Sequence, residues 1–485
     1  MLQIRKMVSE VKEEEEEAGE KVWIVAEERN DLRRWAKIGR AALAAGVLGA
    51  LLSWALVCTS PTRKGTVVVK TPGINLGRKR WGIAGLGRIA YDFAVSLKAN
   101  GGHLEAVAAG SLPNPGSRAS DFGCRFGARH YGTYEALAAD PKVDVVYVAT
   151  TNQLHMDVAL VFVRAGKAVL VEKPTGLDAP QALAMLREAR AHGVLLATNF
   201  WNMLFPVTRW AIDVVKSNKL GEVLAARGDM GFEAVDNLHD RFLSPELGGG
   251  AMLDMGCYIV HLFVQLAAIN FERKGDVARL PTRPREAYEF SRAKLRDHFE
   301  APLRNASRPL ASLDGLARVR ATGHLDRRND DPVDVEASAA VELAGTRLLL
   351  GTSLQRASPF TFDVLAAHGT LSLDSPANCP TSASAAVYRD ANDARNNNTA
   401  PTPCCGQPRL ADLRFASPIP SYPESLKPER YPRGMGFGYV QTAVEACLST
   451  PNCLELPEIP AWTQLATQQI VDAIIREIHQ TNDAF

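Results

Sequence analysis

The segment 80–97, RWGIAGLGRIAYDFAVSL, constrains the fold of this chain more than any other. Residues 81–84 predict a short buried strand, and the apolar spacing through Leu97 has the period of an α-helix. Between them lies a G-x-G-x-x-A motif, formed by Gly85, Leu86, Gly87, Arg88, Ile89 and Ala90. Gly85 permits a tight turn, Gly87 lets a pyrophosphate approach the backbone, and Ala90 permits close contact between helix and strand. Because the N–H groups that open the helix bind anions, the segment predicts a dinucleotide-binding Rossmann domain.

Further apolar runs at 104–110, 143–151 and 168–173 predict more strands, separated by helices. Near-continuous apolar strands of this kind are typical of a doubly wound parallel sheet that is buried on both faces. Functional side chains of such sheets gather at the carboxyl ends of the strands. The residues expected there, in contact with a cofactor, are Thr150, Asn152, His155, Glu172 and Lys173.

The end of the second strand bears on the choice of cofactor. An NAD site usually has an acidic residue here that accepts a hydrogen bond from the ribose 2′-hydroxyl. This chain has Gly110 and Ser111, followed by Arg118. Ser111 and Arg118 can bind a 2′-phosphate, which favours NADP over NAD. The alternative for Arg118 is an ordinary solvated helix residue.

The second half of the chain has a different pattern. Residues 335–355 and 362–374 alternate apolar and polar side chains around glycine turns, which predicts an open, mainly antiparallel sheet. We therefore expect a Rossmann domain over 80–200 and an α+β domain over 201–485, with insertions near 271–317 and 376–411. The net charge of +1 gives no indication of nucleic-acid binding.

The first 79 residues are unlike the rest. Residues 1–40 include five consecutive glutamates and predict an acidic, disordered tail. Residues 41–58 lack charge and would form a helix of about 27 Å, which predicts a single transmembrane anchor, followed by a linker at 59–79. Basic residues before the span favour a catalytic part across the membrane, in a lumen. The alternatives are a buried core helix and a cytoplasmic protein.

The eight cysteines show no C-x-x-C and no zinc spacing, so the sequence predicts no metal site. Cys447 and Cys453 can be bridged if the segment is lumenal.

Four motifs together resemble the Gfo/Idh/MocA oxidoreductase family: GLGRIA at 85–90, ATTNQLH at 149–155, EKP at 172–174 and LGGGAMLDMGCY at 247–258. Within the family the likeness is to dihydrodiol dehydrogenases and NADP-dependent D-xylose dehydrogenases. The resemblance implies that Lys173 is catalytic, that Tyr258 is a general acid/base accompanied by Asp254, and that Thr150, Asn152 and His155 line the nicotinamide ribose. It also implies a sheet that pairs two subunits, and hence a homodimer.

The chemistry of alcohol oxidation is consistent with these roles. A tyrosine with a pKa of about 10 is a poor base near neutrality, and a nearby ammonium favours the phenolate. Asp254 and Tyr258 share one face if their segment is helical, and the glycines at 248–250 would let a ligand approach. The alternative is a structural ion pair between Lys173 and Asp254 beside a core tyrosine.

Some positions depart from the family pattern and leave the substrate open. Met203 stands where the family commonly has an arginine, and Met230 stands where the dihydrodiol enzymes have an aromatic residue. Trp201 and Arg241 are the candidate substrate contacts, although either can equally be a core or surface residue. The expected substrate is a small molecule, either an aldose or a cyclic trans-dihydrodiol. The alternative function is a non-catalytic NAD(P)-binding sensor on the same fold.

Overall fold

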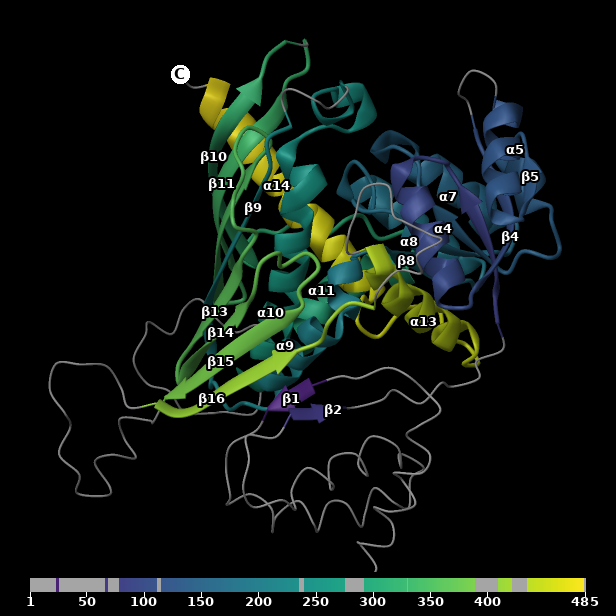
Figure 1. Cartoon of the computed structure of the whole chain (residues 1–485). Helices are drawn as coiled ribbons and strands as arrows, with labels where there is room; N and C mark the ends of the chain where they lie inside the picture. Colours follow the sequence, from purple (N-terminus) through teal and green to yellow (C-terminus); the bar gives the residue numbers. More distant parts are fainter. Residues whose placement is uncertain are drawn as a thin grey trace, which may run out of the picture.

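The computed structural model describes residues 23–25, 66–68, 78–110, 115–234, 240–274, 292–328, 330–388, 409–420 and 434–483. They form a parallel sheet with its helices and a larger, mainly antiparallel sheet, with helices between the two (Figure 1).

Within the described residues the parallel sheet has six strands in the order β5-β4-β3-β6-β7-β8. The strands are β3 (Arg80–Ala84), β4 (His103–Ala108), β5 (Arg129–Tyr131), β6 (Val145–Val148), β7 (Ala168–Val171) and β8 (Leu196–Thr198). Every residue of β6 and β7 is buried, as the apolar runs predict. Strand order reverses between β3 and β6, and in doubly wound folds the ligand crevice lies at this reversal.

Helices cover both faces of this sheet. Helix α4 begins within the glycine motif, at Arg88, and Ala90 in its first turn is fully buried, as the motif predicts. Asp178 caps helix α8 by accepting a hydrogen bond from the N–H of Gln181 at 2.8 Å. The helices are α4 (Arg88–Ala99), α5 (Pro115–Phe126), α6 (Tyr134–Ala138), α7 (His155–Arg164) and α8 (Ala179–Ala191), with a short helix η2 (Asn152–Leu154) before α7.

In the part of the chain that the structure describes, the second sheet has ten strands in the order β10-β11-β12-β9-β13-β14-β15-β16-β1-β2. Among the described strands of this sheet only β9 and β12 pair in parallel, so the predicted open, mainly antiparallel sheet is confirmed. Its strands are β9 (Val223–Gly231), β10 (Ala317–Asp326), β11 (Val333–Leu343), β12 (Thr346–Ser353), β13 (Phe362–Ala366), β14 (Gly369–Leu373), β15 (Ser382–Tyr388), β16 (Arg409–Ala416), β1 (Trp23–Val25) and β2 (Thr66–Val68).

The remaining helices connect the two sheets. In Figure 1, α10 and α14 lie between the large sheet and the Rossmann part, and α13 packs on the Rossmann part. The helices are η3 (Trp201–Leu204), α9 (Pro206–Lys216), η4 (Asp240–Phe242), η5 (Pro245–Leu247), η6 (Met252–Gly256, a π-helical turn), α10 (Cys257–Lys274), α11 (Arg292–Arg304), η8 (Gly434–Gly436), α13 (Phe437–Leu448) and α14 (Ala461–Asp483).

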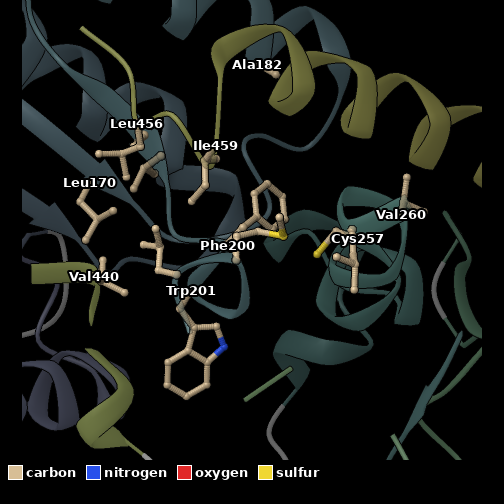
Figure 2. Packing of buried hydrophobic residues seen from close by; sticks show 14 of the residues in the cluster. Leu170, Ala182, Phe200, Trp201, Cys257, Val260, Val440, Leu456 and Ile459 are labelled. Carbon is tan, nitrogen blue, oxygen red and sulfur yellow. The ribbon is translucent and has the colours of Figure 1, made fainter. Parts of the chain in front are cut away.

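One hydrophobic core runs through both parts. Figure 2 shows Leu170 of β7 and Ala182 of α8 in the same cluster as Cys257 and Val260 of α10. Leu456 and Ile459, from the loop before α14, are also fully buried there. The two domains are therefore joined by continuous packing.

Several predictions concern segments that the structure describes only in part. The predicted anchor at 41–58 lies outside the described residues, as does most of the predicted tail and linker. Of the tail, the structure describes Trp23–Val25, which pairs with β16. The predicted insertions contain regular structure, because α11 lies in 271–317 and β15 lies in 376–411.

Among the described residues one helical stretch, Pro245–Asn270, is long and apolar enough to cross a membrane. Its most apolar window is 83% buried inside the protein, and core helices of globular proteins meet the same criterion. Cys447 and Cys453 form a disulfide.

Candidate active site

A cavity of about 1190 Å³ opens at the carboxyl ends of β3, β4, β6 and β7. One side, which we call the Rossmann wall, consists of residues between 85 and 173. The other side, the C-terminal wall, consists of residues between 199 and 437. The predicted site residues that line the cavity are Gly85, Leu86, Gly87, Arg88, Ile89, Arg118, Thr150, Asn152, His155, Glu172, Lys173, Trp201, Arg241, Asp254 and Tyr258. Ala90 packs in the core instead, and Ser111 lies outside the described residues.

The glycine motif forms a cradle in the Rossmann wall. Gly85 has a φ of +87°, and a Cβ added there would lie 2.7 Å from the carbonyl oxygen of Ala149. At Gly87, by contrast, an added Cβ would meet no atom within 4 Å, so the backbone faces open space. Gly87 is the N-cap of α4 and offers no side chain to the first N–H groups of the helix. This surface fits the pyrophosphate of a dinucleotide.

Gly110 at the end of β4 is explained by Tyr134, which sequence reasoning missed. A Cβ at Gly110 would lie 2.3 Å from the Tyr134 ring, so only glycine admits this packing. Burial raises the pKa of Tyr134, although a hydrogen bond from the N–H of Gly110 opposes this shift. The exposed Arg118 donates to the carbonyl oxygen of Leu86 at 3.0 Å, which places its guanidinium at the glycine turn.

The residues after β6 support neighbouring backbone. Nδ1 of His155 lies 2.9 Å from the carbonyl oxygen of Pro174, and the ring is fully buried. Burial lowers the pKa of His155 to about 4, so the ring is neutral near pH 7. The Asn152 amide donates to the carbonyl oxygen of Gly248 at 2.8 Å, linking the two walls. Thr150 lies beside His155, whose Nε2 is 3.4 Å from the Thr150 carbonyl oxygen.

Glu172 lines the cavity, but its carboxylate is engaged within the protein. It accepts hydrogen bonds from the hydroxyl of Tyr147 at 2.5 Å and from the amide of Asn199 at 2.6 Å. Burial raises the pKa of Glu172, although both hydrogen bonds oppose the shift. Its evident role is therefore to fix the end of β7, from which Lys173 projects.

Lys173 spans the cavity and joins the two walls. Its Nζ lies 2.9 Å from Oδ1 of Asp254 and also binds the Asp254 carbonyl oxygen. The same Nζ lies 5.2 Å from the ring centroid of Tyr258. Burial lowers the pKa of Lys173, but the Asp254 carboxylate outweighs it and leaves the pKa raised, so the lysine is an ammonium. The three residues predicted to share the chemistry are thus brought together.

Asp254 lies in the π-helical turn η6, and Tyr258 is the second residue of α10. π-turns of this kind are frequent at functional sites. The glycines before the turn have a different role from the predicted one. A Cβ at Gly248 would lie 2.3 Å from Leu177, and one at Gly249 would lie 2.6 Å from the Phe242 carbonyl oxygen. The expectation of close ligand approach is wrong here, because protein atoms fill that space.

The C-terminal wall is rich in aromatic side chains. Trp201 and Arg241 line it as predicted, and the guanidinium of Arg241 lies 3.7 Å from the Phe242 ring and 3.8 Å from Asp254. Met230, which stands where the dihydrodiol enzymes have an aromatic residue, also lines this wall. Met203 is buried and does not line the cavity. The aromatic residues that sequence reasoning missed are Phe232, Phe242, Phe360 and Phe437.

Phe360 has a left-handed backbone, with a φ of +56°. For a bulky residue this conformation is an outlier that must be held by its surroundings. The carboxylate of Asp229 accepts from the Phe360 N–H and from the Thr361 hydroxyl, each at 3.1 Å. The only sequence signal for Phe360 is the Ser-Pro pair that precedes it.

The cavity fits a dinucleotide better than a metal ion. Among its described lining residues the carboxylates are Glu172 and Asp254, while Arg88 and Arg118 are cations beside the glycine cradle. Within the described part of the chain no group of three or more His, Cys, Asp or Glu side chains could hold a metal ion.

Comparison with known families places these domains. Residues 79–200 match the profile "Oxidoreductase family, NAD-binding Rossmann fold", and residues 208–315 match the Gfo/Idh/MocA C-terminal domain. The resemblance seen in the motifs is therefore confirmed.

Two curated relatives are trans-1,2-dihydrobenzene-1,2-diol dehydrogenases. The enzyme of Xenopus tropicalis is 36% identical over 201 residues, which are 41% of this chain and 59% of the relative. The enzyme of Mus musculus is 38% identical over 186 residues, which are 37% of this chain and 54% of the relative. The chain thus matches little more than half the length of these relatives.

Solved structures share the fold. An aldose-aldose oxidoreductase from Caulobacter crescentus, complexed with glycerol, is 19% identical with a TM-score of 0.58, covering 83% of this chain and 98% of that one. A 3-ketoreductase from Actinomadura kijaniata, with NADP and TDP-benzene, is 21% identical with a TM-score of 0.54, covering 82% and 97%. A levoglucosan dehydrogenase with NADH and levoglucosan is 16% identical with a TM-score of 0.59, covering 83% and 98%.

Proposed function

We propose that this chain, which carries the Rossmann and C-terminal domains of the Gfo/Idh/MocA oxidoreductases, is an NAD(P)-dependent dehydrogenase acting on a CH–OH group. The observation that carries the proposal is the meeting of Lys173, Asp254 and Tyr258 in the dinucleotide cavity. A sensor that only bound the cofactor would need neither of these contacts.

Tyr258 is the proposed acid/base. In the oxidation direction its phenolate oxygen takes the proton of the substrate hydroxyl, and in reduction the phenol returns it. The cofactor, when bound, accepts or supplies the hydride. The ammonium of Lys173 favours the phenolate electrostatically, and Asp254 holds that ammonium in place across the cavity. Asp254 also keeps Lys173 from withdrawing into solvent.

We propose a cyclic trans-dihydrodiol as the substrate class, with an aldose as the alternative. Trp201, Phe232, Phe242 and Phe360 offer apolar faces to a ring, and such faces pack well against an unsaturated carbocycle. An aldose presents hydroxyls around its ring, and each buried hydroxyl requires a hydrogen-bond partner. The names of the relatives from Xenopus tropicalis and Mus musculus agree with the dihydrodiol.

We propose NADP as the preferred cofactor. Arg118 lies at the glycine turn, and no acidic side chain among the described lining residues stands near it to repel a 2′-phosphate. NAD remains the alternative. Of the structural neighbours, one was solved with NADP and one with NADH.

A homodimer is proposed through the outer face of the large sheet. Leu224, Leu349 and Leu365 are each about half exposed on adjacent strands β9, β12 and β13. Exposed apolar groups of this kind are typical of protein interfaces. The test is the molar mass in solution, which Leu349→Arg should halve if this face joins two subunits.

We also propose that the catalytic part faces an oxidising compartment, as the predicted anchor at 41–58 implies. The Cys447–Cys453 disulfide supports this placement, because disulfides persist in such compartments. Labelling of both thiols in intact cells before any reduction would contradict it.

The function is tested by following nicotinamide reduction spectroscopically with the full chain. trans-1,2-Dihydrobenzene-1,2-diol and D-xylose are each supplied with NADP⁺ and with NAD⁺. Tyr258→Phe should lower kcat about 10²–10⁴-fold and leave cofactor affinity unchanged. The matched control is Tyr388→Phe, at the end of β15 and outside the cavity lining. NADP⁺ binding without turnover on either substrate would favour the sensor.

A further inference from the structure

A buried carboxylate lies directly behind the turn that carries Asp254. Asp334, the second residue of β11, is only 2% exposed. Its Oδ2 accepts a hydrogen bond from the N–H of Met252 at 2.8 Å, and Met252 is the first residue of η6. The N–H groups at the start of a helical turn have no partner within the turn, so an outside acceptor fixes their position.

Gly250 shows how closely the two segments fit. It has a φ of +115°, and a Cβ added there would lie 2.5 Å from Oδ1 of Asp334. A glycine is therefore required at this position both by the backbone and by the carboxylate. Asp334 lies on β11, a strand distant in the sequence, and Gly250 lies just before η6. The close fit between them fixes the position of the chain where η6 begins.

The position of the η6 turn also determines the positions of Asp254 and Tyr258. Asp254 is the third residue of η6, and its carboxylate and carbonyl oxygens both bind Lys173. Tyr258 follows immediately in α10. Because η6 has only five residues, a shift of its first N–H group displaces Asp254 and the start of α10 as well.

We propose that Asp334 is a positioning residue for hydride transfer, which sets Asp254 and Tyr258 against Lys173 by capping η6. The inference rests on the proposed function. Asp334 does not line the cavity described above. It lines a second cavity of about 490 Å³, together with Gly248 and Gly249, so it lies outside the site proposed for substrate and cofactor.

The ionisation of Asp334 gives the proposal a distinctive signature. Burial raises the pKa of Asp334 to about 7, although hydrogen bonds from the N–H groups of Met252, Asp334 and Ala251 oppose the shift. The ionised carboxylate is the stronger acceptor, so the cap tightens as pH rises through this range.

Other charged groups lie near this carboxyl, and among the described residues none forms an ion pair with it. The second cavity is also lined by Asp331, Arg476, His479 and Asp483. On β10, Leu325 is paired with Asp334, between His324 and Asp326. On η6 the nearest charged residue is Asp254, which is paired with Lys173.

The test compares Asp334→Ala, Asp334→Asn and Asp331→Asn in the full chain with NADP⁺ and the dihydrodiol. Asp331 is an exposed acid that lines the same second cavity, which makes it the matched control. Asp334→Ala should lower kcat about tenfold, while KM and the NADP⁺ Kd stay within a factor of about three. Asp334→Asn keeps an acceptor and retains most of kcat, but its pH profile loses the ionisation near 7. Asp331→Asn should change none of these quantities.

Hydrogen exchange at the amides of 251–258, measured without substrate, should be faster in Asp334→Ala than in the wild type. If the wild type turns over and Asp334→Ala keeps its kcat, the inference is wrong and the proposed function stands. If the wild type does not turn over, the proposed function fails, and unchanged exchange in this segment would separately overturn the cap.

Discussion

The two walls of the cavity are built in different ways. The Rossmann wall comes from one stretch of chain, and its central residues follow the ends of strands: Gly85 after β3, Thr150 after β6 and Lys173 after β7. The C-terminal wall is assembled from η3, β9, η4, η5, η6, α10 and α13, and from the loops that contain Asn199, Phe360 and Asn378. These segments are not neighbouring strands of one sheet, so the order of the strands does not predict that they meet.

In the proposed function, this difference separates cofactor binding from substrate recognition. Parallel strands deliver their carboxyl ends to one edge, so the Rossmann wall follows from local pattern. The C-terminal wall depends on contacts between distant segments, such as Asp334 with Met252 and Asp229 with Phe360. Variants in the two walls should therefore affect different measured constants.

The largest effect is expected where the walls meet, at Lys173. Lys173→Met removes the ammonium that binds Asp254 across the cavity, and kcat should fall about 10²–10⁴-fold. The Kd of NADP⁺, measured by fluorescence titration, should change less than tenfold because the glycine cradle is intact. Lys142→Met, at an exposed lysine, is the matched control. Equal losses in kcat and in NADP⁺ affinity would instead make Lys173 a cofactor contact only.

His155 in the Rossmann wall and Asp334 behind the η6 turn should also differ in how pH affects stability. The pKa of buried His155 is lowered to about 4, so the stability it contributes is present above its unfolded value of 6.5. That contribution is lost as pH falls towards 4, by up to about 3 kcal/mol. The pKa of Asp334 is raised to about 7, so its contribution is present in acid and lost as pH rises through 7.

Urea unfolding between pH 4.5 and 7.5 measures both contributions. The free energy of unfolding of His155→Gln should fall less than that of the wild type as pH decreases. Relative to the wild type, Asp334→Asn should lose stability as pH decreases. His192→Gln, at an exposed histidine, should follow the wild type. A parallel pH dependence in all four proteins would refute the assignment.

A smaller effect is expected in the C-terminal wall alone, at Phe360. Phe360→Gly removes one aromatic face and should raise the KM for the dihydrodiol about tenfold, with NADP⁺ affinity unchanged. Glycine adopts the left-handed backbone freely, whereas alanine does not, so Phe360→Ala should be about 1 kcal/mol less stable than Phe360→Gly. If the KM values for D-xylose and for the dihydrodiol rise equally, the Phe360 ring does not distinguish the two substrates.

The same contrast explains what the sequence could predict. The motif at 85–90 and the apolar runs were enough for strands β3, β4, β6 and β7, the glycine turn and the positions of Thr150 and Lys173, whereas β5 and β8 were not predicted. Strands β11 to β14 were also predicted, because glycine turns separate alternating residues. Asp254 and Tyr258 were identified through the family resemblance, and the structure brings both to Lys173.

The remaining features depend on tertiary contacts that have no local pattern. Strand β9 mixes polar, charged and small residues, since it is placed by its neighbours β12 and β13. Asp334 resembles any polar residue near a strand end, and its role comes from the turn it caps. Phe360 lies in an irregular loop, and its backbone is held by Asp229 from another strand. The glycines at 248–250 were recognised, but the sequence could not say whether ligand or protein filled the space beside them.

The smallest effect is expected from Arg118, and it tests how far local pattern extends in the Rossmann wall. Arg118 is exposed, and one of its N–H groups already binds the carbonyl oxygen of Leu86. Its remaining N–H groups can bind a 2′-phosphate, but solvent weakens such an ion pair. Arg118→Ala should therefore reduce NADP⁺ affinity only about two- to fivefold and leave NAD⁺ affinity unchanged. Arg125→Ala, on the same helix and outside the cavity lining, is the control. An equal loss for both cofactors would mean that Arg118 acts by holding the glycine turn through Leu86, and that the cofactor preference is set elsewhere.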